Sequence, residues 1–189
     1  MITAKLQGGL GNQMFQIAAA SALAWRNDDV AVFDLNNHYL PLQGRKAHNY
    51  ADNIFRGIEF NDSVRPSYVY READHTYQQI PYKENMSLFG YFQSAKYFED
   101  YSNKIKELFS PDDTTRQYLT DKYGELLDTN TASIHIRRGD YLKFKNIHPT
   151  CTREYYVEAM TFLPGDTNYM IFSDDPEWCL RNFNMKRFK

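Results

Sequence analysis

The order strand, loop, helix, strand occurs twice in this chain, and it constrains the fold more than any other feature. Residues 2–6 form an apolar strand candidate, 7–12 a glycine-rich turn, 13–26 a run with apolar residues at helical spacing, and 30–35 a second strand candidate. Two strands joined through a helix are expected to pair in parallel, because parallel pairing needs a crossover connection of this kind. The start of the chain therefore predicts an α/β fold of the nucleotide-binding type.

The same order returns near the end of the chain. A strand is expected over 132–137, a helix over 152–162 and a strand over 168–173, after which the Asp-Asp-Pro run at 174–176 is suited to cap and begin another helix. Two strands alone make a poor sheet. We therefore expect this second unit to be completed by the first, to be shared with a partner chain or a second copy in a homo-oligomer, or to be truncated.

The middle of the chain has weaker periodicity. Residues 36–79 mix polar and aromatic side chains and predict loops and short helices. Further on, the pattern predicts one strand and two helices, over 86–91, 94–110 and 114–127. We place the domain boundary between the first and second units, which gives an α/β domain over 1–130 and a partial Rossmann-like domain over 131–189.

Composition excludes several classes of protein. The formal net charge is −2 and no long basic block occurs, which argues against a nucleic-acid partner or an anionic membrane. Cys151 and Cys179 lie outside any zinc-ligand or Cys-x-x-Cys spacing, so no zinc site or disulfide framework is predicted. The apolar stretch 17–25 is too short to span a membrane, and no charged leader precedes it. We expect a soluble, cytoplasmic protein.

Two adjacent arginines follow the apolar strand at 132–137 and enter a glycine turn. Alternation places His135 and Arg137 on the same face of the strand, while Arg138 begins the turn. A guanidinium matches phosphate oxygens two at a time and keeps its charge, so the pair predicts a diphosphate site that needs no metal ion. The alternative is a surface pair that makes ordinary salt bridges.

A glycine-rich loop, residues 8–11, lies where orphan N–H groups at a helix start favour an anion. It is not a dinucleotide fingerprint, because Met14 stands where the pattern requires glycine, and no Gly-Lys-Ser or Gly-Lys-Thr sequence follows. The loop presents Asn12 and Gln13, whose amides can donate and accept hydrogen bonds to hydroxyls. The alternative is a tight turn without a ligand.

Candidate general bases are His135, Asp140 and His148, because histidine titrates near neutral pH and a carboxylate can accept a proton from a sugar hydroxyl. A lone histidine on a strand is more often a hydrogen-bonded structural residue. No Asp-x-Asp triplet occurs, which counts against a divalent cation and leaves the arginines as the counter-charge.

Four stretches, in this order, resemble the motifs of the glycosyltransferase family 11 α-1,2-fucosyltransferases. They are Gly-Gly-Leu-Gly-Asn-Gln-Met-Phe-Gln at 8–16, Gly-Tyr-Phe-Gln-Ser at 90–94, His-Ile-Arg-Arg-Gly-Asp-Tyr at 135–141 and Ile-Phe-Ser-Asp-Asp-Pro-Glu-Trp at 171–178. The resemblance implies metal-independent transfer of fucose from GDP-fucose to a galactoside hydroxyl, with inversion and no cofactor. It also implies a GT-B fold, in which two Rossmann-like units face each other across a cleft, the first on the acceptor side and the second binding the donor.

The resemblance also implies roles for particular residues. The catalytic group is Arg137, Arg138, Asp140 and His135, in which the arginines hold the diphosphate and the other two shape the turn and the nucleotide pocket. The motif identifies no base, and we expect it to be Asp140 or His135. The donor-binding group is Gly9, Gly11, Asn12, Gln13, Ser173, Asp174 and Asp175. The implied partners are a sugar nucleotide and a galactose-containing glycan, through which the protein could also lie at a membrane surface.

One motif implied by the resemblance is missing. Family members continue into an Asn-Ser-x-Phe-Ser-Trp-Trp-like stretch that helps to bind the donor, and no such stretch occurs in these residues. We therefore expect the second unit to be truncated. The alternative function is a non-catalytic remnant that binds a glycan or a protein partner.

Overall fold

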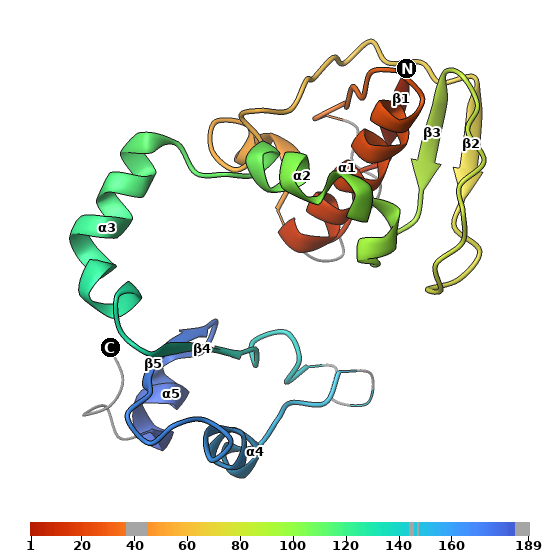
Figure 1. Cartoon of the computed structure of the whole chain (residues 1–189). Helices are drawn as coiled ribbons and strands as arrows, with labels where there is room; N and C mark the ends of the chain where they lie inside the picture. Colours follow the sequence, from red (N-terminus) through yellow and green to blue (C-terminus); the bar gives the residue numbers. More distant parts are fainter. Residues whose placement is uncertain (37–44, 144–145, 147, 184–189) are drawn as a thin grey trace. The chain divides into compact units, whose positions relative to one another are not determined.

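The computed structural model describes residues 1–36, 45–143, 146 and 148–183, and it divides into two compact units, Met1–Asp113 and Thr114–Lys189. Each unit has its own parallel sheet and its own hydrophobic core (Figure 1). The mixed α/β class expected from the sequence is confirmed in each unit.

The sheet of the first unit has three parallel strands in the order β1–β3–β2. The strands are β1 (Ile2–Ala4), β2 (Tyr68–Arg71) and β3 (Met86–Phe89). The expected strand at 30–35 forms only isolated bridges, at Ala31 and Phe33. Its hydrogen bonds are divided between two neighbours, because Val32 N–H donates to Ile2 O at 3.0 Å while Phe33 N–H donates to Glu59 O at 3.0 Å.

Helix α1 (Leu10–Arg26) packs against one face of this sheet and begins three residues before the predicted start, with Gly9 as its N-cap. Its residues from Gln16 to Ala24 are all buried, and they are mostly alanine. Small side chains let the helix lie close to β1. The largest fully buried apolar residues of this core are Phe33, Phe55, Phe92, Ile2, Ile17, Met86 and Leu88.

The sequence prediction is wrong at 94–110, where one helix was expected. The chain instead forms the short 3₁₀ turns η2 (Ala95–Tyr97) and η3 (Glu99–Tyr101) and then α2 (Ser102–Leu108). Phe98 has φ −140° and ψ 13°, outside the helical region, which interrupts the helix between the two turns. Part of the poorly patterned segment 36–79 forms η1 (Ala47–Tyr50) and β2, while residues 37–44 lie outside the described residues.

The second unit contains two parallel strands and three helices among its described residues. They are α3 (Asp113–Leu127), β4 (Thr131–Ile136), α4 (Arg153–Met160), β5 (Asn168–Ser173) and α5 (Pro176–Asn182). Thr131 lies opposite Asn168 and Ile136 opposite Ser173. The expected truncation of this unit stays a prediction.

The compact units divide after residue 113, whereas the sequence analysis places the domain boundary after residue 130. Helix α3 therefore groups with the second unit. The hydroxyl of Thr131, at the start of β4, donates to Leu126 O near the end of α3 at 2.6 Å. Just before α3, the guanidinium of Arg56 donates to Ser110 O within the first unit.

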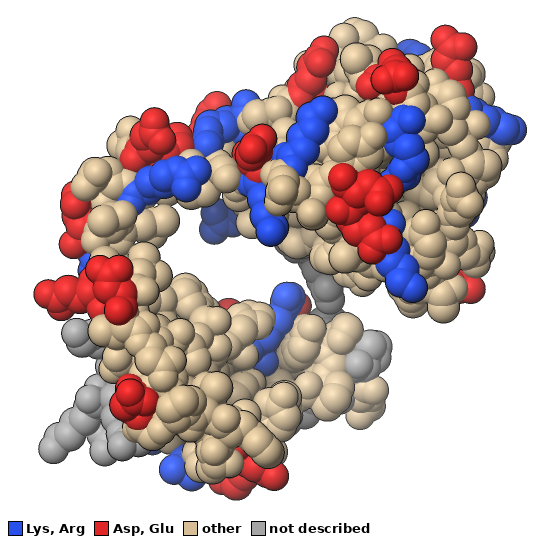
Figure 2. Space-filling model, viewed as in Figure 1, with Lys and Arg blue, Asp and Glu red and all other residues tan. Residues whose placement is uncertain are grey.

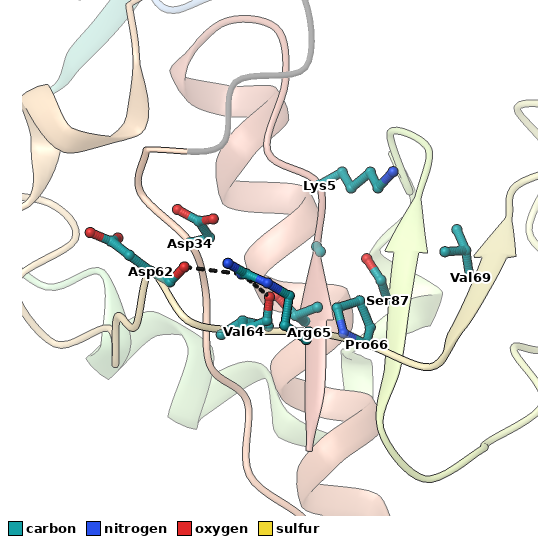
Figure 3. A pocket seen from close by; sticks show the side chains of 10 residues that line it. Lys5, Asp34, Asp62, Val64, Arg65, Pro66, Val69 and Ser87 are labelled. Carbon is teal, nitrogen blue, oxygen red and sulfur yellow. Dashed lines mark hydrogen bonds between the residues drawn. The ribbon is translucent and has the colours of Figure 1, made fainter.

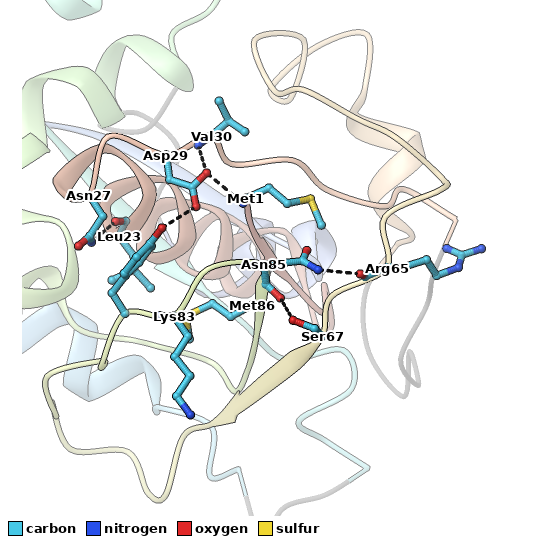
Figure 4. A network of polar contacts seen from close by, with 11 residues as sticks. Met1, Leu23, Asn27, Asp29, Val30, Arg65, Ser67, Lys83, Asn85 and Met86 are labelled. Carbon is cyan, nitrogen blue, oxygen red and sulfur yellow. Dashed lines mark hydrogen bonds and ion pairs between the residues drawn. The ribbon is translucent and has the colours of Figure 1, made fainter.

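Asp29 fixes the start of β1 to the loop after α1 (Figure 4). Its Oδ1 lies 3.0 Å from the Met1 ammonium and accepts from Val30 N–H at 2.8 Å, and its Oδ2 accepts from the Tyr82 hydroxyl at 3.2 Å. Burial alone would raise the pKa of Asp29, but these hydrogen bonds and the ammonium charge lower it below its ordinary value. The carboxylate therefore stays ionised and holds the edge of the sheet.

Charges of both signs are mixed on the face of the protein that Figure 2 shows. On the face in Figure 2, Lys and Arg side chains of the first unit are interspersed with Asp and Glu side chains, in keeping with the net charge of −2. Within the described residues, no helix combines the length and the apolar character needed to cross a bilayer.

Candidate functional site

The arginine turn follows β4, as the sequence predicts. Ile136 is fully buried, Ile134 is partly buried and His135 is exposed, so the predicted alternation is confirmed. After the strand, Leu142 N–H donates to Arg138 O at 2.8 Å and closes the turn. The turn therefore has a defined backbone next to the end of β5.

Arg137 is held by Asp140 through two hydrogen bonds. Its Nε donates to Oδ1 at 3.1 Å and its Nη2 to Oδ2 at 2.8 Å, and its guanidinium lies 4.9 Å from the centre of the Tyr141 ring. The hydrogen bond from Arg137 lowers the pKa of Asp140, and the same contact raises the pKa of Arg137. Both oxygens of Asp140 are thus engaged, which suits the carboxylate to positioning Arg137 more than to accepting a proton.

Arg138 is held by the residues that follow β5. Its backbone N–H donates to Asp174 Oδ1 at 2.8 Å, its Nε donates to Asp175 Oδ2 at 3.1 Å, and its guanidinium lies 4.2 Å from the centre of the Trp178 ring. Only 16% of its side chain is exposed, compared with 43% for Arg137. Arg138 is therefore the more firmly fixed of the two arginines.

Asp175 joins three parts of this site. Its Oδ1 caps α5 by accepting from Trp178 N–H at 3.1 Å, while its Oδ2 binds Arg138 and its own N–H donates to Ser173 Oγ at 3.0 Å. The capping hydrogen bond and then the Arg138 contact lower the pKa of Asp175. The predicted N-cap is confirmed, and the same carboxylate also orients the guanidinium.

Each guanidinium is bound by a carboxylate along one side only. A guanidinium has five N–H donors in a planar fork. Among the described residues, no hydrogen-bond acceptor is found for Nη1 of Arg137 or for either Nη group of Arg138. These donors are available to the oxygens of a ligand. Because Asp140 and Asp175 offset the two charges, a diphosphate would be held by directed hydrogen bonds more than by unpaired charge.

The glycine loop of the first unit, residues 8–11, is held by side chains of the same unit. Gly8 has φ +75°, and a Cβ there would lie 2.4 Å from Asn12 Nδ2, so glycine is required. Gln13 is buried and its Nε2 donates to Gly8 O at 2.9 Å and Arg45 O at 2.8 Å. Gln13 therefore supports the loop backbone, and Gly9 and Gly11 have open space where a Cβ would stand.

The loop after β1 contacts the loop after β3, at the carboxyl edge of the sheet where ligands of open parallel sheets bind. Asn12 Oδ1 accepts from Gln93 Nε2 at 2.6 Å, and Gln7 Nε2 donates to Gly90 O at 3.4 Å. Glu72 holds the second loop, because its carboxylate accepts from Tyr91 N–H at 2.6 Å and from Phe92 N–H at 3.0 Å. These contacts bring two of the quoted motifs together.

The predicted site residues thus form two local groups, one in each unit. The first consists of Gly9, Gly11, Asn12 and Gln13, and the second of Arg137, Arg138, Asp140, Ser173, Asp174 and Asp175. His135 lies on β4 just before the second group and lines a cavity with Tyr155 of α4. Within the described part of the chain, no three His, Cys, Asp or Glu side chains are placed to share a metal ion.

Sequence reasoning missed several residues that build these groups. Trp178 and Tyr141 lie inside the quoted motifs, and in the structure their rings lie against Arg138 and Arg137. The aromatic residues of these motifs were the sequence signal that could have identified them. Tyr141 also stacks on His148, with ring centres 4.6 Å apart. Glu72 lies in the poorly patterned segment and carried no signal.

The chain is similar to known glycosyltransferases over almost its whole length. The model of glycosyl transferase family 11 matches residues 1–188. An alpha-1,2-colitosyltransferase of Escherichia coli is 30% identical over 214 residues, which cover 97% of this chain and 72% of that protein. A galactoside 2-alpha-L-fucosyltransferase of Caenorhabditis elegans is 29% identical over 196 residues, covering 94% of this chain and 53% of that protein.

Solved structures of a third protein share the fold. The crystal structure of fucosyltransferase NodZ from Bradyrhizobium aligns with a TM-score of 0.57 at 12% identity, covering 100% of this chain and 77% of that one. A structure of NodZ alpha-1,6-fucosyltransferase soaked with GDP-fucose aligns with a TM-score of 0.53 at 11% identity, covering 100% and 76%.

Proposed function

The chain belongs to glycosyl transferase family 11, and on that premise we propose that it transfers fucose from GDP-fucose to a galactoside hydroxyl. The proposed linkage is α-1,2, formed with inversion and without a metal ion. The observation that carries the proposal is the pair of guanidiniums, each oriented by a carboxylate and each with Nη donors for which the described residues provide no acceptor. A galactoside fucosyltransferase among the relatives and a NodZ structure soaked with GDP-fucose support fucose as the sugar.

In the proposed mechanism, Arg137 and Arg138 bind the diphosphate and stabilise the negative charge that grows on GDP as the fucosyl bond breaks. The acceptor hydroxyl attacks the anomeric carbon from the opposite side, its oxygen forms the new bond, and its proton passes to a base. Both oxygens of Asp140 are held by Arg137, which leaves His135 and His148 as candidate bases. We assign the base to His135, because the ring of His148 is stacked on Tyr141. Ser173, Asp174 and Asp175 support the nucleoside side of the site, and Asp175 also positions Arg138.

The proposal includes a GT-B fold. It gives the glycine loop, with Gly9, Gly11 and Asn12, a role in donor binding, and Gln13 supports that loop. The acceptor is a galactose-containing glycan. Colitose is a second candidate for the transferred sugar, because a colitosyltransferase is among the relatives and colitose is fucose without its 3-hydroxyl.

Calorimetry on the full chain tests the donor site with GDP, GDP-fucose, GDP-colitose and GDP-mannose, with UDP as the control nucleotide. GDP and GDP-fucose are expected to bind, GDP-mannose more weakly, and chelation of divalent cations should leave the affinity unchanged. If GDP-colitose binds more tightly than GDP-fucose, colitose is the sugar that the protein transfers. Absence of GDP and GDP-fucose binding at millimolar concentration would contradict a working donor site.

Gly139 gives a test of how Asp174 supports the turn. A Cβ at Gly139 would lie 2.8 Å from Asp174 Oδ2, so Gly139→Ala should displace the carboxylate that accepts from Arg138 N–H. Loss of that charge-assisted hydrogen bond is expected to weaken GDP binding by about tenfold. Gly165→Ala is the matched control, because a Cβ there meets nothing within 4 Å. If both variants fold and bind GDP with equal affinity, Asp174 does not contribute to GDP binding.

A further inference from the structure

A cavity of about 480 Å³ lies on the first unit, against the sheet (Figure 3). Asp34, Asp62 and Arg65 lie on one side of it, and Ser87 and Val69 on the other. Its volume is in the range of about 300–1,000 Å³ that is usual for small-molecule sites. None of the roles proposed above uses this cavity.

The cavity faces the side of the sheet that α1 does not cover. Thr3, Ser87 and Val69 lie opposite one another on β1, β3 and β2, and all three line the cavity. The neighbouring positions Ile2 and Met86 point to the other face and are fully buried in the core. A parallel sheet normally presents apolar side chains on both faces. The two hydroxyl-bearing residues in the middle of this face are therefore unusual for a sheet face that packs on a core, and they suit a polar ligand.

Both hydroxyl-bearing residues are almost fully buried. Ser87 is 1% exposed and Thr3 is 4% exposed. In the described part of the chain, no hydrogen bond is found for either side chain, and neither oxygen is among the fully buried atoms that lack a partner. Both oxygens would become buried if the cavity were filled, so a ligand that supplies donors and acceptors is favoured over one that does not.

The charged residues around the cavity balance in sign. Lys5 and Arg65 oppose Asp34 and Asp62. Arg65 is oriented by its own loop, since its Nη1 donates to Val64 O at 2.8 Å and Asp62 O at 3.2 Å, and Asp62 Oδ2 accepts from Asn36 Nδ2 at 2.6 Å. Equal numbers of cations and carboxylates favour neither an anion nor a cation.

We propose that this cavity binds a neutral pyranoside, as a subsite for the saccharide acceptor. The proposal rests on the proposed function, because a glycosyltransferase needs a saccharide acceptor. A neutral sugar ring carries many hydroxyls that both donate and accept, which matches two hydroxyls, two carboxylates and two cations around one cavity. An inorganic anion would gain no net attraction from this balanced lining, and an apolar ligand would leave Thr3 and Ser87 unpaired.

The test is a titration of the ¹⁵N-labelled full chain with methyl β-D-galactopyranoside, followed by NMR. Amide shifts are expected at Thr3, Ser87 and Val69. Thr3→Val, which removes the hydroxyl and keeps the volume, should weaken binding by about tenfold, whereas Thr3→Ser should retain it. Thermal unfolding shows whether Thr3→Val is folded. If it is not folded, Ser87→Ala is titrated instead.

Three outcomes would overturn the proposal: shifts confined to other parts of the chain, equal affinity of Thr3→Val and wild type, or competition by inorganic phosphate. Titration with GDP separates this result from the donor site. If GDP binds and the sugar does not, the cavity proposal fails and the proposed donor site stands. If the sugar binds at the cavity and GDP binds nowhere, the sugar site stands and the proposed transfer fails.

Discussion

Replacing Arg138 with lysine is expected to lower fucosyl transfer by about a hundredfold or more, as the loss of a fixed donor to a transition-state oxyanion does in other enzymes. Lysine keeps the charge but has no planar fork. It would lose the 3.1 Å hydrogen bond to Asp175 Oδ2 and the stacking on Trp178 at 4.2 Å. The measurements are the turnover of GDP-fucose with a galactoside acceptor and the GDP affinity.

Arg181→Lys is the matched control for this prediction. Arg181 lies on the same helix as Trp178, is 67% exposed and pairs only loosely with Glu177 at 3.6 Å. Its replacement should leave GDP affinity and turnover close to wild type, because exposed ion pairs of this kind contribute little. Wild-type turnover in Arg138→Lys would show that Arg138 takes no part in the mechanism.

Replacing Gln16 with methionine is expected to destabilise the first unit by about 2–4 kcal/mol. The Gln16 amide is fully buried and makes a reciprocal pair with the Gln7 backbone. Its Oε1 accepts from Gln7 N–H at 2.9 Å and its Nε2 donates to Gln7 O at 3.1 Å. Methionine fills the same space but leaves both backbone groups without partners. Denaturant unfolding of the full chain measures the loss.

Gln117→Met is the control, since Gln117 is also inside a helix but is exposed, and its side chain donates to Asp121 Oδ1 at 2.7 Å. Its replacement should cost about 0.2–0.5 kcal/mol. The NMR spectrum of Gln16→Met should also show changed amide shifts in the loop that begins at Gly8. Equal stability of the two variants would mean that the Gln7 backbone finds other partners.

The sequence was sufficient to predict the elements that are determined by the spacing of apolar residues and by capping. Helix α1 follows from apolar residues at helical spacing, β5 was predicted with its observed bounds, and Asp175 caps α5 at the Asp-Asp-Pro run. The side-chain alternation along β4 was also predictable, because a strand with one buried face has a period of two.

The remaining features depend on contacts between distant residues. β2 is half-buried and is defined by its pairing with β3, so the segment around it shows little periodicity of its own. The interruption at Phe98 arises where aromatic side chains pack on the core, which overrides helical spacing. In the site, the charge of the arginine pair was predictable, but its neutralisation by Asp175 joins residues 37 positions apart.

The ring of Trp178 beside Arg138 makes this site visible to optical spectroscopy. The chain has two tryptophans, and Trp25 lies in the first unit, where it contacts Tyr101 and the Lys104 ammonium. Each compact unit therefore carries one tryptophan, whose fluorescence can be excited without exciting the tyrosines. A Trp25→Phe chain reports on the arginine turn and α5, and a Trp178→Phe chain reports on α1 and its neighbours, so the two units can be followed separately in one molecule.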